Sequence, residues 1–219
     1  MARRPVLPHA PRVAPPDLPR LTDTVSGLRA QEEYFQVRVE DLEDVTDAAH
    51  AVLTECSITG ATVSRLDLEG ATLVDVEVDE LRAAAVAARG SRLRRVRLAG
   101  GRIGTLDLSL AEVDEVELRG IRIDYLSLAG GAVQDLLITD CVITTLDLPQ
   151  AKLSRVRFDA ARADEVDTRG LRADSTDLRG LEAGSYLDVG SLRGATLTPW
   201  QVEQLAPAFA AALGIDVRD

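Results

Sequence analysis

The stretch GATVSRLDLEGATLVDVEV, residues 60–78, decides the fold because its apolar residues recur every five positions. The central apolar residues of successive units are Val63, Leu68, Leu73 and Val78. A step of five residues advances an α-helix by ~500°, so these positions would spiral around a helix instead of sharing one face. A second apolar position lies two residues before each central one, which breaks the strict alternation of a β-strand. The period therefore predicts neither an amphipathic helix nor a plain strand.

The same period continues along most of the chain. Stepping by five from Leu53 to Ala183 gives 27 positions, of which 26 are apolar and only Thr168 is not. Two residues before each centre, small and large side chains alternate with few exceptions, and glycine recurs at many multiples of ten, where corners need a permissive backbone. A short period kept over so many residues predicts a solenoid, in which each unit buries its apolar residues by stacking on its neighbours.

Residues 51–183 resemble the pentapeptide repeat protein family. The units of that family read small–polar–Leu/Phe–polar–polar, as in ATLVD (71–75), CVITT (141–145) and AKLSR (151–155). The resemblance implies an all-β fold, a right-handed quadrilateral parallel β-helix with four units per coil. The 27 units would then form nearly seven coils, and at ~4.8 Å between stacked strands the column would be roughly 32 Å long. The tail at 192–215 is similar to the ending of actinobacterial members.

The segments outside the repeats differ in composition. Residues 1–20 are rich in Pro and Arg without periodicity and are interpreted as a flexible arm. Residues 21–50, which contain the strand-like YFQVRV, are expected to lead into and cover the first end of the β-helix at 51–197. Residues 81–90 have alanine at two central positions, so we expect loose packing there, with room for a local bulge.

Residues 198–215 are predicted to form a short C-terminal helix. Thr198 suits the N-cap, Pro199 the first helical position, and Gln201 completes a capping box. Pro207 is expected to kink or split this helix. Its apolar residues have two compatible interpretations, a plug over the open end of the column or a homodimer interface of the kind that the family resemblance implies. The candidate residues are Trp200, Val202, Leu205, Phe209 and Leu213.

The sequence contains no recognisable catalytic or metal-binding pattern. Cys56 and Cys141 occupy small inward positions and are interpreted as core residues, while His9 and His50 have no metal-ligand spacing. No nucleophile elbow, phosphate-binding loop or dinucleotide fingerprint is present. The chain is therefore predicted not to be an enzyme and to need no cofactor.

Charge and composition limit the partners. The net charge of −11 disfavours direct binding to nucleic acid or anionic lipid. No stretch approaches 18 apolar residues, and the N-terminus lacks the apolar core of a signal peptide, so we expect a cytoplasmic protein without a membrane span.

An acidic belt is the candidate partner surface. Residues 101–150 contain nine acidic and three basic residues, and a basic cluster at residues 89–97 precedes them. The alternative is an ordinary solvated surface of mixed charge. The candidate residues of the acidic belt are Glu112, Asp114, Glu115, Glu117, Asp124, Asp135 and Asp140.

Two functions follow as hypotheses. The first is a non-enzymatic protein that binds an unidentified protein partner through its solenoid faces. The alternative, implied by the family resemblance, is a DNA mimic that binds and protects DNA gyrase. Either could act as a homodimer through the C-terminal helix.

Overall fold

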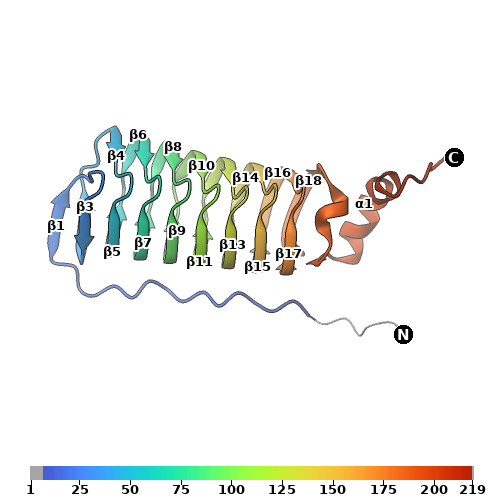
Figure 1. Ribbon diagram of the computed structural model, residues 1–219, viewed down its shortest axis with the longest axis horizontal. Helices are drawn as coiled ribbons and strands as arrows, with labels where there is room; N and C mark the ends of the chain where they lie inside the picture. The colour runs from blue at the N-terminus through green and yellow to red at the C-terminus, as the bar shows by residue number, and fades with distance from the viewer. Residues whose placement is uncertain (1–6, 219) are drawn as a thin grey trace.

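The computed structural model describes residues 7–218 and shows a straight column of stacked parallel strands (Figure 1). The column has about eight turns and carries one helix at its C-terminal end. The larger sheet consists of β1 (Asp23–Ser26), β2 (Glu33–Phe35), β3 (Val37–Glu40), β5 (Val52–Thr59), β7 (Thr72–Asp79), β9 (Arg92–Ala99), β11 (Glu112–Arg119), β13 (Ala132–Thr139), β15 (Lys152–Asp159), β17 (Arg172–Asp177) and β19 (Ala195–Thr196). The smaller sheet consists of β4 (Val45–Asp47), β6 (Thr62–Asp67), β8 (Arg82–Ala87), β10 (Arg102–Asp107), β12 (Arg122–Ser127), β14 (Val142–Asp147), β16 (Ala161–Asp167) and β18 (Leu181–Tyr186).

The register between neighbouring coils follows directly from the five-residue period. Val113 pairs with Leu93 on one side and with Val133 on the other, so each coil consists of four units. The pairing skips position 115 in β11 and position 104 in β10, and at these residues the chain turns from one short face to the next. The prediction of a parallel, four-sided pentapeptide-repeat solenoid is thus confirmed by the chain's own register.

The corners explain the regular glycines. Gly60 and Gly70 have φ values of 68° and 64°, in the left-handed region that glycine adopts without strain. A third corner in every coil is left-handed as well, with φ between 50° and 55°, yet it carries side chains. Its residues, called the charged corner below, are Glu55, Asp75, Arg95, Glu115, Asp135, Arg155 and Ser175.

Aliphatic side chains fill the interior of the column. The largest fully buried side chains include the aromatic Phe158 and the aliphatic Leu53 and Ile123. Cys56 and Cys141 are buried and unpaired, as expected, and burial raises the pKa of both thiols. The bulge considered for residues 81–90 does not form, because β8 pairs in register with both β6 and β10. The expected loose packing appears instead as an apolar cavity of about 40 Å³ lined in part by Ala88.

The two ends of the column depart from the regular register of four units per coil. At the first end, residues 21–50 form β1 to β4, and the first strands are joined by shorter loops, so that Asp23 pairs with Val37 and Glu33 with Val52. At the other end, the 3₁₀ turn η1 (Val189–Leu192) precedes β19, and Thr176 pairs with Ala195 where the regular step would reach Thr196.

The N-terminal segment lies outside this strand pairing. Residues 7–20, part of the expected flexible arm, run back from β1 along the outside of the column (Figure 1). Residues 1–6 of that arm lie outside the described residues.

The C-terminal helix α1 (Pro199–Ala212) begins as predicted. Thr198 accepts a hydrogen bond from the Gln201 N–H, the Gln201 side chain accepts one from the Thr198 N–H, and Pro199 follows the cap. The helix is not split at Pro207 but continues to Ala212. No helix within residues 7–218 is both long and apolar enough to cross a bilayer.

Candidate protein-interaction surfaces

A shallow groove of about 480 Å³ runs across four consecutive coils on one face of the column. It lies over the first halves of β7, β9, β11 and β13, before the charged corner. Leu73, Leu93 and Val113 lie beneath it, but they are inward central residues and are buried, so the outward residues form its accessible surface. The outward positions on either side carry the charges. We call this surface the groove face, and its outward residues are Thr72, Val74, Arg92, Arg94, Glu112, Asp114, Ala132 and Gln134.

Only the two middle coils of the groove face carry charges, arginines on one and carboxylates on the next. Arg92 donates to Glu112 of the next coil at 3.3 Å, and Gln134 donates to Asp114 at 3.1 Å. These partners meet because corresponding residues of successive coils are neighbours across the strands. Exposed pairs of this kind contribute ~0–1 kcal/mol to stability, so they leave the surface free to exchange partners.

The basic cluster at residues 89–97 lies between two acidic coils. Arg97 reaches Glu77 of the preceding coil at 3.4 Å and Glu117 of the following coil at 3.7 Å. Arg95 donates to Asp75 at 2.6 Å. The cluster therefore offsets part of the acidic belt beside it.

The residues of the acidic belt lie on several sides of the column. Glu112 and Asp114 are on the groove face, and Glu115 and Asp135 are on the charged corner. Glu117 lies beyond that corner in β11 and pairs with Arg97 and Arg119. Asp124 belongs to the smaller sheet and pairs with Arg102 at 3.1 Å, and Asp140 forms another left-handed corner. The structure therefore brings together only part of the set on any one face.

Asp135 is buried, with 3% of its surface exposed. Burial opposes its ionisation, but the Arg155 guanidinium and the Arg12 N–H hold its pKa below the usual range. Arg155 donates through Nε and Nη2 at 2.7 and 2.6 Å, and Arg12 donates its backbone N–H at 2.9 Å. Asp135 is therefore a fixed carboxylate beneath the N-terminal arm.

The candidate residues of the C-terminal helix divide into two groups. Leu205 and Phe209 are partly buried and pack against the core of the column. Trp200, Val202 and Leu213 are exposed, Trp200 by 62%. The helix thus covers the end of the column while leaving part of its own apolar surface free.

Gln201 joins the helix to the last coil. Its amide nitrogen donates to the carbonyls of Leu178 and Leu181 at 2.8 and 2.9 Å. Those carbonyls belong to the open end of the column, where no further coil follows. One side chain therefore closes the capping box and satisfies two backbone acceptors of the terminal coil.

Sequence reasoning did not single out Asp75 or its contact with the N-terminal arm. Asp75 accepts from Arg95 and from the Asp17 N–H, which lies 58 residues away in the sequence. A signal was present, since the charged corner reads Glu, Asp, Arg twice in succession from Glu55 to Arg155. Comparing the corresponding residues of successive coils would have identified Asp75 and the charged corner, though not the contact with the arm.

The described residues hold no arrangement suited to metal binding. Across residues 7–218, no three His, Cys, Asp or Glu side chains are close enough to hold a metal ion. A hollow of about 570 Å³ lies at the first end between residues 38–42 and 59–62, where the register changes. Its lining includes the charged Arg38, Glu40 and Asp41 and two threonines, Thr59 and Thr62, but no Ser, Cys or His, and within the described residues neither threonine hydroxyl is hydrogen-bonded to a base.

Comparison with solved structures finds matches that extend over most of this chain. One is a trypsin-treated variant of QnrB1, a plasmid-mediated fluoroquinolone resistance protein, with 14% identity, a TM-score of 0.29, and coverage of 90% of this chain and 99% of that one. Another is HetL, a pentapeptide repeat protein involved in heterocyst differentiation regulation from the cyanobacterium Nostoc, with 14% identity, a TM-score of 0.36, and coverage of 80% and 89%. A second QnrB1 variant has 16% identity, a TM-score of 0.31, and coverage of 90% and 100%.

No protein-family model and no curated protein matches the chain. Because the three TM-scores lie below 0.5, the functional assignment of this protein rests on its own residues. The similarity of its tail to actinobacterial members stays a prediction.

Proposed function

We propose that this protein is a non-enzymatic binding protein whose solenoid faces dock a protein partner, with the groove face as the contact surface. The observation that carries the proposal is the groove itself, a hollow four coils long whose outward residues include charges of both signs. A hollowed surface with charges of both signs suits recognition of a protein partner by electrostatic complementarity.

The interior of the column supports this over a catalytic role. Its apolar cavity holds only about 40 Å³, whereas pockets for small molecules usually hold ~300–1,000 Å³. The central positions are closely packed aliphatic residues, so a substrate has no enclosed site in the column.

The charge pattern defines the partner that would fit. Arg92 and Arg94 lie on one coil, and Glu112 and Asp114 lie on the next, about 4.8 Å away. A partner with acidic side chains opposite the first coil and basic side chains opposite the second would be complementary. Such a contact is weakened by salt, because exposed charges are screened beyond ~8–10 Å.

Mimicry of DNA by a protein that binds gyrase would require a more continuous acidic surface than the groove face provides. Glu112 and Asp114 stand beside two arginines, and Asp135 is covered by the arm. We therefore place docking of a charge-patterned protein ahead of DNA mimicry.

Site-specific cross-linking tests the proposal. A photo-reactive amino acid replaces exposed Ala132 on the groove face, and Val142, exposed on another face, is the control position. In cells of the source organism we expect a discrete cross-linked product from position 132 alone. The product should disappear when Arg92 and Arg94 are both changed to Glu, and persist when Arg82 and Arg122 are both changed to Glu.

Equal products from both positions, or indifference to Arg92→Glu with Arg94→Glu, would contradict docking on the groove face. A parallel assay of DNA supercoiling by purified gyrase addresses the alternative. Inhibition that is lost on reversing Asp114 and Glu115 would favour mimicry instead.

A further inference from the structure

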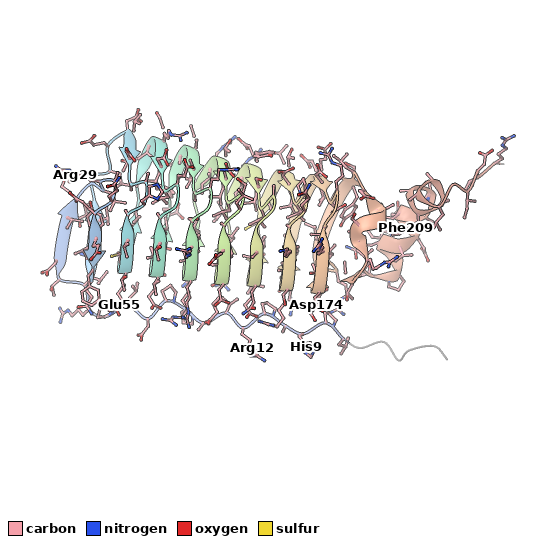
Figure 2. The ribbon with its side chains drawn as sticks, viewed as in Figure 1. His9, Arg12, Arg29, Glu55, Asp174 and Phe209 are labelled. Carbon is pink, nitrogen blue, oxygen red and sulfur yellow. The ribbon has the colours of Figure 1, made fainter. Side chains whose placement is uncertain are left out.

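Residues 7–20 lie along the charged corner for much of the length of the column. Figure 2 shows His9 and Arg12 on this arm, with Asp174 and Glu55 on the column at either end of the stretch that the arm follows. The arm enters no strand pairing, and none of residues 7–20 is buried. The core of the column is therefore complete without it.

Two backbone hydrogen bonds hold the arm to the corner. The Arg12 N–H donates to Asp135 Oδ1 at 2.9 Å, and the Asp17 N–H donates to Asp75 Oδ1 at 3.0 Å. Each carboxylate is itself fixed by the arginine of the next coil, Arg155 or Arg95. The corner thus presents two immobile acceptors that bind backbone rather than a particular side chain.

The spacing of donors matches the spacing of acceptors. Asp75 and Asp135 lie three coils apart, ~14 Å at the usual separation of stacked strands. Arg12 and Asp17 lie five residues apart, ~15.5 Å in a polyproline II chain. Five residues of extended chain therefore span three coils, and both hydrogen bonds form without bending the arm.

The side chains of the arm follow the same period. The half-buried ones alternate at spacings of three and two residues, while those between them are exposed. This set consists of Pro8, Pro11, Val13, Pro16 and Leu18. The half-buried residues of the arm, which face the column, therefore recur with a period of five residues.

Proline and charge both suit the arm to this surface. Each of the two donors directly follows a proline, Pro11 or Pro16, which favours the extended conformation in advance and lowers the entropy lost on docking. The positive charge of Arg12 faces Asp135, and the negative charge of Asp17 faces Arg95.

We propose that the charged corner is a binding surface for an extended, proline-rich peptide with backbone donors five residues apart, and that residues 7–20 are its tethered occupant. A partner carrying a segment of this chemistry competes with the arm for Asp75 and Asp135. The charged corner is separate from the groove face, so either proposal can fail alone.

The first experiment measures whether the arm detaches when its two donors are removed. Spin labels are placed at Ala10→Cys and Asp174→Cys in the full chain, where the native cysteines are buried. Arg12→Pro with Asp17→Pro removes both N–H donors but keeps the chain extended. Arg12→Ala with Asp17→Ala removes the same side chains and keeps the donors. We expect a narrow distance distribution in the parent and the alanine variant, and a broad one in the proline variant.

The second experiment supplies the peptide separately. A fluorescent peptide of residues 7–20 is titrated into the full-length proline variant, whose charged corner is uncovered, and into the parent, whose charged corner is covered by the arm. We expect at least tenfold tighter binding to the uncovered corner. A peptide with proline at both donor positions should bind at least tenfold more weakly than the natural peptide.

Three results would overturn the proposal. One is an unchanged distance distribution in the proline variant, which would mean that the two donors do not hold the arm. Another is equal detachment in the alanine variant, which would assign docking to side-chain charge. The third is equal binding of the peptide to the proline variant and to the parent. A docked arm that competes with the peptide must weaken its binding to the parent.

Discussion

Ala88 interrupts a stack of leucines in the column. The same inward position is Leu68 in the preceding coil and Leu108 in the following one, and all three line the apolar cavity of about 40 Å³. We expect Ala88→Val to fill part of this space and raise the free energy of unfolding by up to ~1 kcal/mol, the value that ~24 cal/mol per Å³ gives for the whole cavity. Urea denaturation monitored by circular dichroism measures the change.

Ala163 provides the matched control for Ala88. It is also a central alanine and is fully buried, but it does not line the cavity. Ala163→Val should therefore overpack the coil and destabilise it by ~1–3 kcal/mol. Equal effects of the two substitutions would mean that the cavity does not limit stability.

The Asp75–Arg95 pair links stability to pH. The Arg95 guanidinium holds the pKa of Asp75 below its usual value although burial opposes this, and the Asp17 N–H adds to the effect. A carboxylate whose folded pKa is lowered stabilises the fold above its unfolded pKa of ~3.9, and this contribution is lost as the pH falls through the lowered value. Acidification below pH ~4 should therefore weaken the wild type at this site.

Asp75→Asn tests that linkage. At pH 7 we expect the variant to be less stable than the wild type by ~1–3 kcal/mol, because the neutral amide leaves Arg95 without its charged partner. The difference should be smaller at pH 3, which lies below the unfolded pKa of ~3.9, because protonation of the unfolded chain removes part of the advantage of the wild type. Urea unfolding at both pH values measures it, with exposed Asp164→Asn as the control. A difference that does not change with pH would contradict the linkage.

At the scale of elements, the start of helix α1 should stabilise the last coil as well as the helix. Thr198→Ala removes the N-cap acceptor and is expected to cost about 1 kcal/mol. Gln201→Ala removes the other half of the capping box and both donations to Leu178 and Leu181, so it should cost more, ~1–3 kcal/mol.

Hydrogen exchange separates these two cap effects. Gln201→Ala should speed exchange in β17 and β18 as well as in α1, whereas Thr198→Ala should act mainly on the helix. Exposed Glu203→Ala serves as the control for substitution on the helix. If both cap variants leave β18 unchanged, Gln201 does not couple the helix to the column.

The sequence was enough to predict these elements because each coil repeats the same steric problem. Inward residues must recur every five positions, and the helix cap depends on local residues such as Thr198 and Gln201. The contact of the arm could not be predicted in this way, because the extended proline-rich segment carries no helical or strand periodicity and its acceptors are distant in the sequence.

The residues of the acidic belt are close in sequence but do not form one surface in the structure. Glu115 and Glu117 are close in sequence, yet Glu115 forms the left-handed corner and Glu117 lies on the face beyond it.

At the scale of the whole molecule, the column leaves one apolar surface incompletely covered at its C-terminal end. Val202 and Leu213 are exposed by 45% and 76%, and they share a helix face with the partly buried Leu205 and Phe209. Every copy of the protein presents this half-covered helix face at the same end of its column. A two-fold dimer uses the same surface patch on both subunits, so this face meets that requirement.

We therefore expect the protein to dimerise through this face, with a mass in solution of twice 23.5 kDa. Val202→Glu with Leu213→Glu places two like charges in the interface and should give the monomer mass, while the nearby exposed Glu203→Gln should keep the dimer. Sedimentation velocity over a wide range of protein concentration measures the two states, and unchanged circular dichroism shows that the column stays folded. If the wild type remains monomeric at the highest concentration, the prediction is wrong and the helix only covers the end of the column.

Two columns joined at their C-terminal ends would place two groove faces on one particle. A partner with two matching sites would then bind more tightly than either face allows alone.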